Sequence, residues 1–468
     1  MKNRLLALSM LSALWPSLVG AAPAAVTKEQ QRDVMVTIYN GNLGLVKDTR
    51  EVRLGPGTIE VQFADVAAQI DPTSVHLKSL SDPAGLKIHE QNYEYDLLTS
   101  EKLLEKFVGR TVRVYQSNGS FQEATLLSTK GPVYSMNGQI HTGFQGHVVF
   151  PALPENLVSK PTLVWLLRNA TATAQRIEAS YLTAGINWKA DYVMVIDPTD
   201  ARSDLTGWVT IENKSGASYA NAALKLVAGD VNRAVSRDLR LGHEALAARP
   251  APPADASREF KSEGFFEYHL YSLDGRTTIK DNQTKQLTLL SAHGVSLDKR
   301  FIFYGAQHVH RAPTGLVIAN QKVGVYLELQ NSKANRLGIP LPKGKVRVYK
   351  ADTAGSHQLI GEDWIDHTPE DERVKIKMGH AFDVIGERAQ KEWRKLGSNL
   401  YEVEWEISLR NHKKENITVE VVEPMPGDWE VLRSTLPHEK VDASTARFRV
   451  PVPRQGEAKL TYRARLQW

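Results

Sequence analysis

The chain has 468 residues, no cysteine and a formal net charge of +5. This length exceeds that of one typical domain, so we expect two to four domains. Without cysteine the fold contains no disulfides, which excludes the small disulfide-bonded secreted scaffolds and leaves burial and strand pairing to hold it together. The small charge excess, with both signs present throughout, argues against nucleic acid as a partner.

Residues 1–24 have the pattern of a secretory signal peptide. Lys2 and Arg4 form a short positive segment, residues 5–19 are predominantly apolar, and residues 20–24 are small, as a signal peptidase requires. We therefore expect an exported protein that is periplasmic, secreted or associated with the outer membrane. No second long apolar segment follows, so no transmembrane helix is expected in the mature chain.

Alternation of apolar and polar residues dominates the remainder of the chain. It is clear at residues 34–39, 323–329 and 401–409, where one side of each segment is apolar and the other polar. Turn-forming sequences fall where hairpins need them, at residues 55–57, 117–119, 136–138 and 342–344. The pattern predicts an all-β fold of several antiparallel units, with a small barrel-like insert and immunoglobulin-like sandwiches.

Changes in strand spacing and composition predict the domain boundaries. Residues 237–263 are rich in Ala, Pro, Arg and Glu and poor in large apolar groups, as in a linker or a loop. The predicted units are an N-terminal β unit (30–106), a small SH3-like β barrel insert (107–152), a β sandwich (160–236), the linker (237–263) and a C-terminal β region (264–468) that ends in a sandwich (320–468).

Helix signals are few. Residues 97–107 carry Ser100 as a candidate N-cap and Leu103, Leu104 and Phe107 on one face. Residues 387–396 are charged and contain Trp393, and they fit a second helix or an irregular loop equally well. One or two short helices are therefore expected.

Metal and cofactor signals are weak. His308 and His310 are two residues apart on a predicted strand, so both imidazoles would lie on one face and be compatible with a shared ion. No third ligand is identifiable, and packed or solvated histidines are the simpler interpretation. Phosphate loops, nucleophile elbows and thiol nucleophiles find no match, so no cofactor is expected.

The densest acidic stretch covers residues 362–372. Glu362, Asp363, Asp366 and His367 could contribute to a calcium site, but the stretch lacks the spacing and the central glycine of a calcium-binding loop. A solvated hairpin rim is the simpler interpretation, and the acidic residues remain candidates for ligand binding.

Tryptophans are the other candidate binding residues. Seven of them could line a carbohydrate or peptide groove, but most lie on the apolar register of predicted strands, so we expect core packing. These residues are Trp165, Trp188, Trp208, Trp364, Trp393, Trp405 and Trp429.

The last nine residues have the pattern of a strand with an aromatic end. Leu460, Tyr462, Ala464, Leu466 and Trp468 alternate with polar residues and end on an aromatic residue, which is typical of outer-membrane β-barrels. A final strand that closes a sandwich shows the same alternation, so the barrel remains an alternative.

Three groups of segments resemble the domain of unknown function found in bacterial mucoidy-inhibitor-A-like proteins. They lie at residues 181–192, 205–216 and 224–231, then at 338–349, 360–363 and 367–369, and finally at 379–384 and 411–413. The resemblance covers about residues 160–468 and implies an exported, β-rich bacterial protein without an established activity. Asp363, Asp383 and Arg388 are the motif charges, for which we expect a buried structural ion pair.

From these observations we expect a non-catalytic protein that binds or scaffolds an envelope protein or polymer. Edge strands of β sandwiches are ready sites for pairing with a partner. A hydrolase of envelope or extracellular polymer is the alternative from another class, with Asp383 or the carboxylates of residues 362–366 as acids.

Overall fold

The computed structural model describes residues 23–96, 98–115, 119–142, 146–152, 154, 157–229, 231–232, 260–305, 312–313 and 317–467. Several predictions therefore fall wholly or partly on residues outside this description. These are the signal peptide up to residue 22, the linker up to residue 259, the histidine pair His308 and His310, part of the turn at 117–119 and the terminal Trp468.

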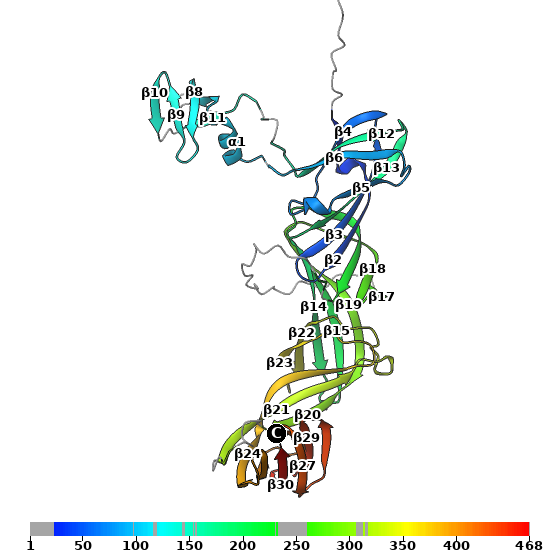
Figure 1. Ribbon diagram of the computed structural model, residues 1–468, viewed down its shortest axis with the longest axis vertical. Coiled ribbons are helices and arrows are strands. Elements are labelled where there is room, and N and C mark those ends of the chain that lie inside the picture. Colours follow the sequence, from blue (N-terminus) through cyan, green and yellow to red (C-terminus); the bar gives the residue numbers. More distant parts are fainter. Residues whose placement is uncertain are drawn as a thin grey trace, which may run out of the picture.

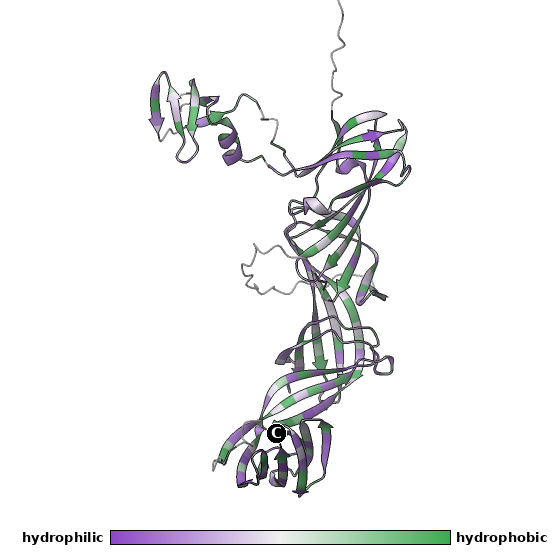
Figure 2. Ribbon diagram, viewed as in Figure 1, coloured by the Kyte–Doolittle hydropathy of each residue, from purple (hydrophilic) through white to green (hydrophobic). Residues whose placement is uncertain are grey.

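The described chain is almost entirely β, and the all-β prediction is confirmed. Its strands form five sheets that are mainly antiparallel. Four of them succeed one another along an elongated body, and the fifth, which contains β8, β9 and β10, projects to the side (Figure 1). Apolar and polar residues alternate along most strands (Figure 2), which gives each sheet a buried and an outward face. The helical segments are α1 (Ser100–Phe107) and the 3-10 turns η1 (Lys28–Gln30), η2 (Pro72–Ser74) and η4 (Lys333–Asn335).

The N-terminal end of the body contains two sheets. The four-stranded sheet has the order β1 (Ala24–Val26), β4 (Gly57–Ala64), β12 (Thr162–Asn169), β6 (Leu86–Glu94). The seven-stranded sheet has the order β17 (Phe260–Phe265), β18 (Tyr268–Ile279), β16 (Tyr219–Ala228), β2 (Gln31–Tyr39), β3 (Leu43–Arg53), β13 (Ala174–Thr183), β5 (His76–Ser79). Strands from residues 30–106 and 160–236 thus pair with one another in both sheets.

A small five-stranded antiparallel sheet is inserted between β6 and β12. Because Glu94 of β6 faces Thr162 of β12, the insert departs from and returns to one antiparallel strand pair. It has its own small core, to which Phe107 of α1 contributes. The strand order is β10 (Gln139–Thr142), β9 (Val133–Met136), β8 (Phe121–Ser128), β7 (Thr111–Tyr115), β11 (His147–Val149).

A second five-stranded sheet forms the middle of the body. Its inner face carries Trp188, Tyr192 and Val346, which pack into the large core shared with the N-terminal sheets. Strands β14 and β22 are parallel neighbours, although they are far apart in the sequence. The strand order is β19 (Gln283–Ser296), β15 (Arg202–Asn213), β14 (Ile186–Ile196), β22 (Gly344–Ala351), β23 (His357–Ile365).

The C-terminal sheet has nine strands and contains a second large core. Trp405, Phe448 and Tyr462 lie in that core, contributed by three of its strands. The order is β27 (Asp428–Ser434), β30 (Gly456–Gln467), β25 (Leu400–Asn411), β24 (Arg373–Lys395), β21 (Val317–Gln330), β20 (Asp298–Tyr304), β26 (Ile417–Pro424), β29 (Thr445–Val452), β28 (His438–Asp442).

The long strands β21 and β24 take part in both large cores. Leu329 and Ile376 pack into the first core, whereas Val323 and Val384 of the same two strands pack into the second. The two strands pair along most of their length, with register shifts where they pass between the cores. The middle and C-terminal sheets are therefore joined by paired strands and not by a single connecting segment.

The two helix predictions had different outcomes. The first helix exists as α1, but its N-cap is Thr99, whose side chain accepts a hydrogen bond from Lys102 N, and Ser100 is its first residue. The prediction for residues 387–396 was wrong in both of its forms. Most of this segment, up to Lys395, belongs to β24 and pairs with β25, because its outward residues find cross-strand partners there.

Candidate functional site

Polar side chains form a continuous network over the outward face of the middle five-stranded sheet. Gln286 Nε2 on β19 donates to Thr210 Oγ1 on β15 over 3.1 Å. Thr210 Oγ1 in turn donates to Asp191 Oδ2 on β14 over 2.7 Å. Arg347 on β22 lies 3.8 Å from Asp191 and 3.5 Å from Glu362 on β23. The contacts therefore cross all five strands.

Lys345 completes this network and connects it to a tryptophan. The Nζ atom of Lys345 lies 3.2 Å from Glu362 Oε1 and 5.5 Å from the ring centroid of Trp364. Trp364 is 59% exposed, so most of its ring remains open to solvent. We call Gln286, Thr210, Asp191, Arg347, Glu362 and Lys345 the outer-face network.

A second tryptophan lies in the same cross-strand row. Trp208 of β15 faces Asp191 of β14, Asp191 faces Lys345 of β22, and Lys345 faces Trp364 of β23. Direct partners on neighbouring strands lie on one face of a sheet, so the two indoles share the outward face. Trp208 is partly buried. Trp188, three residues before Asp191 in β14, lies on the opposite face of the sheet and is buried in the core.

The loop that follows β23 is fixed by Asn331, which is fully buried. Its Nδ2 group donates to the carbonyl oxygens of Ile339 and Pro369, both at 2.8 Å, and its Oδ1 accepts from Gly338 N. A backbone bridge between Leu341 and Thr368 adds to this connection. Segments 338–341 and 368–369, which belong to one group of motif segments, are therefore in direct contact.

Two tyrosines hold the motif segment from the other side. Tyr271 Oη donates to Pro340 O over 2.9 Å, and Tyr192 Oη donates to Pro342 O over 2.8 Å. Burial raises the pKa of both hydroxyls, so they remain protonated and available as donors. The prolines have no N–H group, and their carbonyl groups supply the only backbone hydrogen-bonding capacity at these positions.

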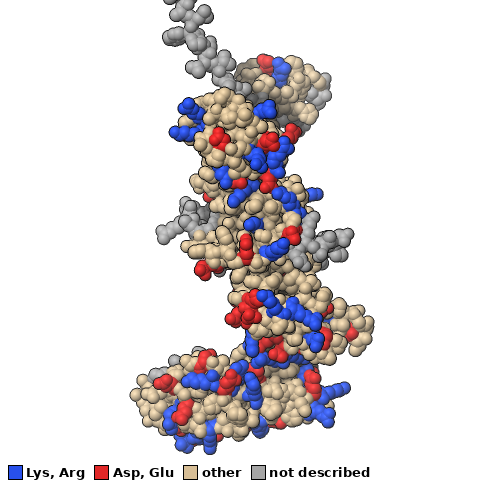
Figure 3. Space-filling model, turned by 90° about the vertical axis from the view of Figure 1, so that its right-hand side faces the viewer, with Lys and Arg blue, Asp and Glu red and all other residues tan. Residues whose placement is uncertain are grey.

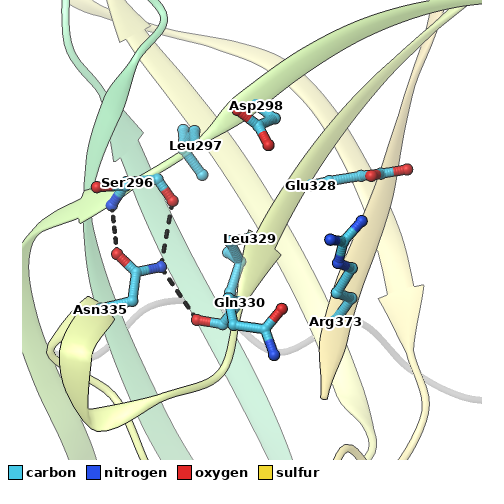
Figure 4. Close-up of a pocket in the computed structure, with 8 residues that line it drawn as sticks. All are labelled: Ser296, Leu297, Asp298, Glu328, Leu329, Gln330, Asn335 and Arg373. Carbon is cyan, nitrogen blue, oxygen red and sulfur yellow. Dashed lines mark hydrogen bonds between the residues drawn. The ribbon is translucent and has the colours of Figure 1, made fainter. Parts of the chain in front are cut away.

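Two hollows flank the start of β24. The first, of about 190 Å³, is shown in Figure 4, where Asn335 bonds the backbone of Ser296 and Gln330. Glu328 and Arg373 project from neighbouring strands beside it (Figure 4). The second hollow, of about 480 Å³, lies between Trp364–Pro369 and Glu372–Lys375. Arg373 lines both hollows, and Trp364 joins the second hollow to the outward sheet face.

Glu362 and Asp363, two of the predicted site residues, have different positions. Glu362 belongs to the outer-face network through Lys345 and Arg347. Asp363 points the other way, and its Oδ2 accepts a hydrogen bond of 2.6 Å from Lys377 N on β24. Asp363 therefore ties the edge of the middle sheet to the C-terminal sheet, which is a structural role.

Asp366 and His367 lie at the second hollow. The Asp366 side chain is 93% exposed and lies 3.7 Å from Lys343 Nζ. His367 Nδ1 accepts a hydrogen bond of 3.1 Å from Lys343 N. Asp366 is therefore a solvated carboxylate, whereas His367 is hydrogen-bonded to the backbone.

The other two predicted residues lie away from the hollows. Asp383 is exposed, and its carbonyl oxygen accepts a hydrogen bond from His412 N. Arg388 is buried and forms a 2.8 Å ion pair with Glu423, while its guanidinium lies 4.0 Å from the centre of the Trp405 ring. Of the three motif charges, Arg388 alone is in a buried ion pair.

The ion pair between Arg388 and Glu423 is enclosed in the C-terminal core. Burial raises the pKa of the Glu423 carboxyl even with Arg388 beside it. Burial opposes the charged form of Arg388, but the neighbouring Glu423 and Tyr462 raise its pKa. A Cβ atom at Gly305 would lie 2.3 Å from Glu423 and 2.6 Å from Arg388, so only glycine allows the chain to pass here.

Neither a metal site nor a membrane span emerges from the described residues. Within them, no three His, Asp or Glu side chains are grouped so that they could hold a metal ion. No helix in this part of the chain has the length and apolarity needed to cross a bilayer.

Sequence reasoning missed several members of the network and misplaced one. It proposed no role for Asp191, Lys345 or Arg347. It also expected core packing for most of the tryptophans, and Trp364, which lies beside the network, is an exposed exception. A signal was present, because Trp364 is two residues after Glu362 and therefore lies on the polar side of β23.

The comparison with protein families matches the chain at residues 177–468 with the model of a domain of unknown function, DUF4139. This match covers more than half of the chain and includes every strand of the middle sheet and of the C-terminal sheet. The chain therefore belongs to the DUF4139 family. No curated protein matched the sequence.

Proposed function

We propose that this protein is an exported, mucoidy-inhibitor-A-like protein of the cell envelope that binds or scaffolds an envelope component without catalysing a reaction. The observation that carries the proposal is the wide outward face of the middle sheet. It combines an exposed tryptophan with polar groups already held by one another. The signal-peptide pattern of residues 1–24 and the three groups of motif segments support export and the closer relationship.

The geometry of the carboxylates favours binding over catalysis. Asp191 and Glu362 are engaged in ion pairs with Arg347, and Asp363 bonds the backbone. Asp366 projects into solvent. These carboxylates therefore serve as paired, hydrogen-bonded or solvated groups, which favours a binding role.

Fractionation and in-cell crosslinking test this proposal together. We expect fractionation to recover the protein with the cell envelope in processed form, shorter by the leader. A photoreactive residue in place of Leu359, which is 54% exposed on β23, should capture a partner. The same residue at Ile140, which is 72% exposed on the insert, is the matched position away from the sheet. An unprocessed protein in the cytoplasm, or equal capture at both positions, would contradict the proposal.

A hydrolase remains the second candidate because the second hollow places Asp366 and Glu372 beside Trp364. If it were correct, Asp366→Asn and Glu372→Gln would abolish the release of reducing ends from an envelope polymer. We expect no such release from the unchanged protein.

A further inference from the structure

We propose that the outward face of the middle five-stranded sheet is a binding platform for a neutral polysaccharide chain. The inference deepens the proposed function and rests on it, since it names the ligand class of the same surface. The platform consists of Trp364, Trp208 and the outer-face network.

The aromatic part of the platform suits a sugar ring. The faces of a pyranose present C–H groups, which carry slight positive charge and are attracted to the negative face of an indole. Trp364 offers this face because it is 59% exposed while Lys345 holds the ring from one side. The exposed indole also supplies apolar area that a bound sugar ring can remove from water, which favours binding.

The polar part of the platform suits hydroxyl groups. The side chains of Asp191, Glu362 and Arg347 are fixed by mutual contacts, so their remaining donors and acceptors keep defined directions. Groups held in this way lose little conformational freedom when a ligand binds. A sugar chain has many hydroxyls, each of which donates and accepts, and it can use both kinds of group.

The charge balance of the platform indicates a neutral ligand. Lys345 and Arg347 are the cationic members of the network, and Asp191 and Glu362 are the anionic members. These charges are equal in number and paired at short range. Exposed Lys189, which faces Thr210, and exposed Glu212 add one charge of each sign to the same face, so these residues give no excess of cations for a phosphate or carboxylate polymer. Figure 3 shows the same mixture over the side of the body that it displays, where blue and red groups alternate without a field of one sign.

The dimensions of the platform indicate a chain and not a single sugar. Trp208 and Trp364 lie on β15 and β23, which are separated by β14 and β22. At about 4.8 Å per strand, the two tryptophans are roughly 14 Å apart across the sheet. The second hollow, with a volume of about 480 Å³, extends the platform beyond Trp364. A ligand that used all of these groups must be extended.

Affinity electrophoresis of the full mature chain tests this inference. The gels contain dextran, a soluble β-1,3-glucan or xyloglucan as neutral probes, and alginate as an anionic probe. We expect at least one neutral probe to retard the protein and alginate to have no specific effect. Trp364→Ala should weaken the retardation roughly tenfold in apparent affinity, the effect of removing a central aromatic contact. Trp364→Phe should restore a measurable part of it.

The matched control is Phe382→Ala, because Phe382 is 95% exposed on β24 and its loss removes an exposed aromatic residue away from the network. This variant should bind as the unchanged protein does. Unfolding curves that superimpose for Trp364→Ala and the unchanged protein exclude a folding defect. Retardation by none of the neutral probes, retardation only by alginate, or equal loss with Phe382→Ala would overturn the inference. The proposed envelope function would survive these outcomes, because processing and crosslinking test it separately.

Discussion

Arg388 and Glu423 show how a single pair of side chains is tied to the stability of the C-terminal core. Their side chains are 1% and 0% exposed, so neither charge has access to water. Attraction between buried charges offsets their lost hydration only while both partners are present. Replacing one member of the pair should therefore lower the stability of the core strongly, whereas replacing both members with apolar residues should lower it little.

We predict that Arg388→Met lowers the free energy of unfolding by about 3–5 kcal/mol, because it leaves Glu423 buried without its cation. The double variant Arg388→Met with Glu423→Leu should recover most of this loss. Chemical denaturation of the three proteins measures the difference. Equal destabilisation by the single and double variants would contradict the assignment of a buried pair.

Asp200 is the centre of a second ion cluster, at the turn between β14 and β15. Lys299 Nζ donates to it over 2.7 Å, and Lys350 Nζ also donates to it. Partial burial opposes its ionisation, but these two lysines hold the pKa of Asp200 below its usual range. Because the folded-state pKa lies below the unfolded value, the stabilisation is present at neutral pH and lost as the pH falls through the folded-state pKa.

We predict that Asp200→Asn lowers the free energy of unfolding by about 1–2 kcal/mol at neutral pH. The difference from the unchanged protein should shrink in acid and disappear below the folded-state pKa. Asp200 has a φ of 60°, a conformation that asparagine also tolerates, so the substitution tests charge and leaves the backbone unstrained. Urea unfolding across a descending pH series provides the measurement; a difference that stays constant in acid would rule out the ion cluster.

At the scale of the element, the hairpin of β17 and β18 has an unusual turn. Phe265 pairs with Tyr268, which leaves Phe266 and Glu267 as the two turn residues. Phe266 has a φ of 56° and is 85% exposed. Glycine is favoured at such a position because a side chain there is strained, and the phenylalanine buries little area in return.

We therefore predict that Phe266→Gly raises the free energy of unfolding by about 0.5–1 kcal/mol. Phe266→Ala is the control, since it removes the ring but keeps a Cβ atom at positive φ, and it should give no comparable gain. Thermal unfolding of both variants distinguishes them. An equal gain from alanine would show that the exposed ring, and not the backbone, is unfavourable.

The neighbouring strands β14 and β22 show how residues from separate parts of the sequence form one binding surface. Lys345 and Arg347 alternate with Val346 and Val348 along β22, which places both cations on one side of the strand. The parallel pairing of β14 with β22 then places Asp191 beside Lys345 and Arg347. Neither strand contains information about this neighbour in its own sequence, so the network could not be predicted in full.

At the scale of the whole molecule, the insert is a separate unit carried by one strand pair. Its core is distinct from the two large cores, and its connecting segments bond to each other through the backbones of Asp96, Leu98 and Val158. In Figure 1 it projects to the side of the elongated body. The paired strands β6 and β12 require only a short turn between their ends.

We predict that replacement of residues 95–161 by an Asn-Gly turn leaves the rest of the molecule folded. Asn-Gly favours the two-residue turn that joins antiparallel strands. The circular dichroism spectrum of the shortened protein should still be that of a folded β protein. Its free energy of unfolding, from chemical denaturation, should match that of the full mature chain within about 1 kcal/mol. Collapse of the main transition would mean that the insert supports the large core.

The sequence by itself determined the class of fold, because alternation with a period of two marks strands and shows which side of each is apolar. It also pointed to the segment 362–367 as a candidate site. Through the family resemblance it predicted a buried ion pair among the motif charges Asp363, Asp383 and Arg388, which holds for Arg388 alone. Tertiary structure decided which strands are neighbours, and hence that Arg388 pairs with Glu423 while Asp363 bonds the backbone of β24. It also decided that Trp364 is exposed and aligned with Trp208. The physical reason is that alternation fixes the face on which a side chain lies but not the strand beside it, since pairing depends on the packing of distant segments into shared cores.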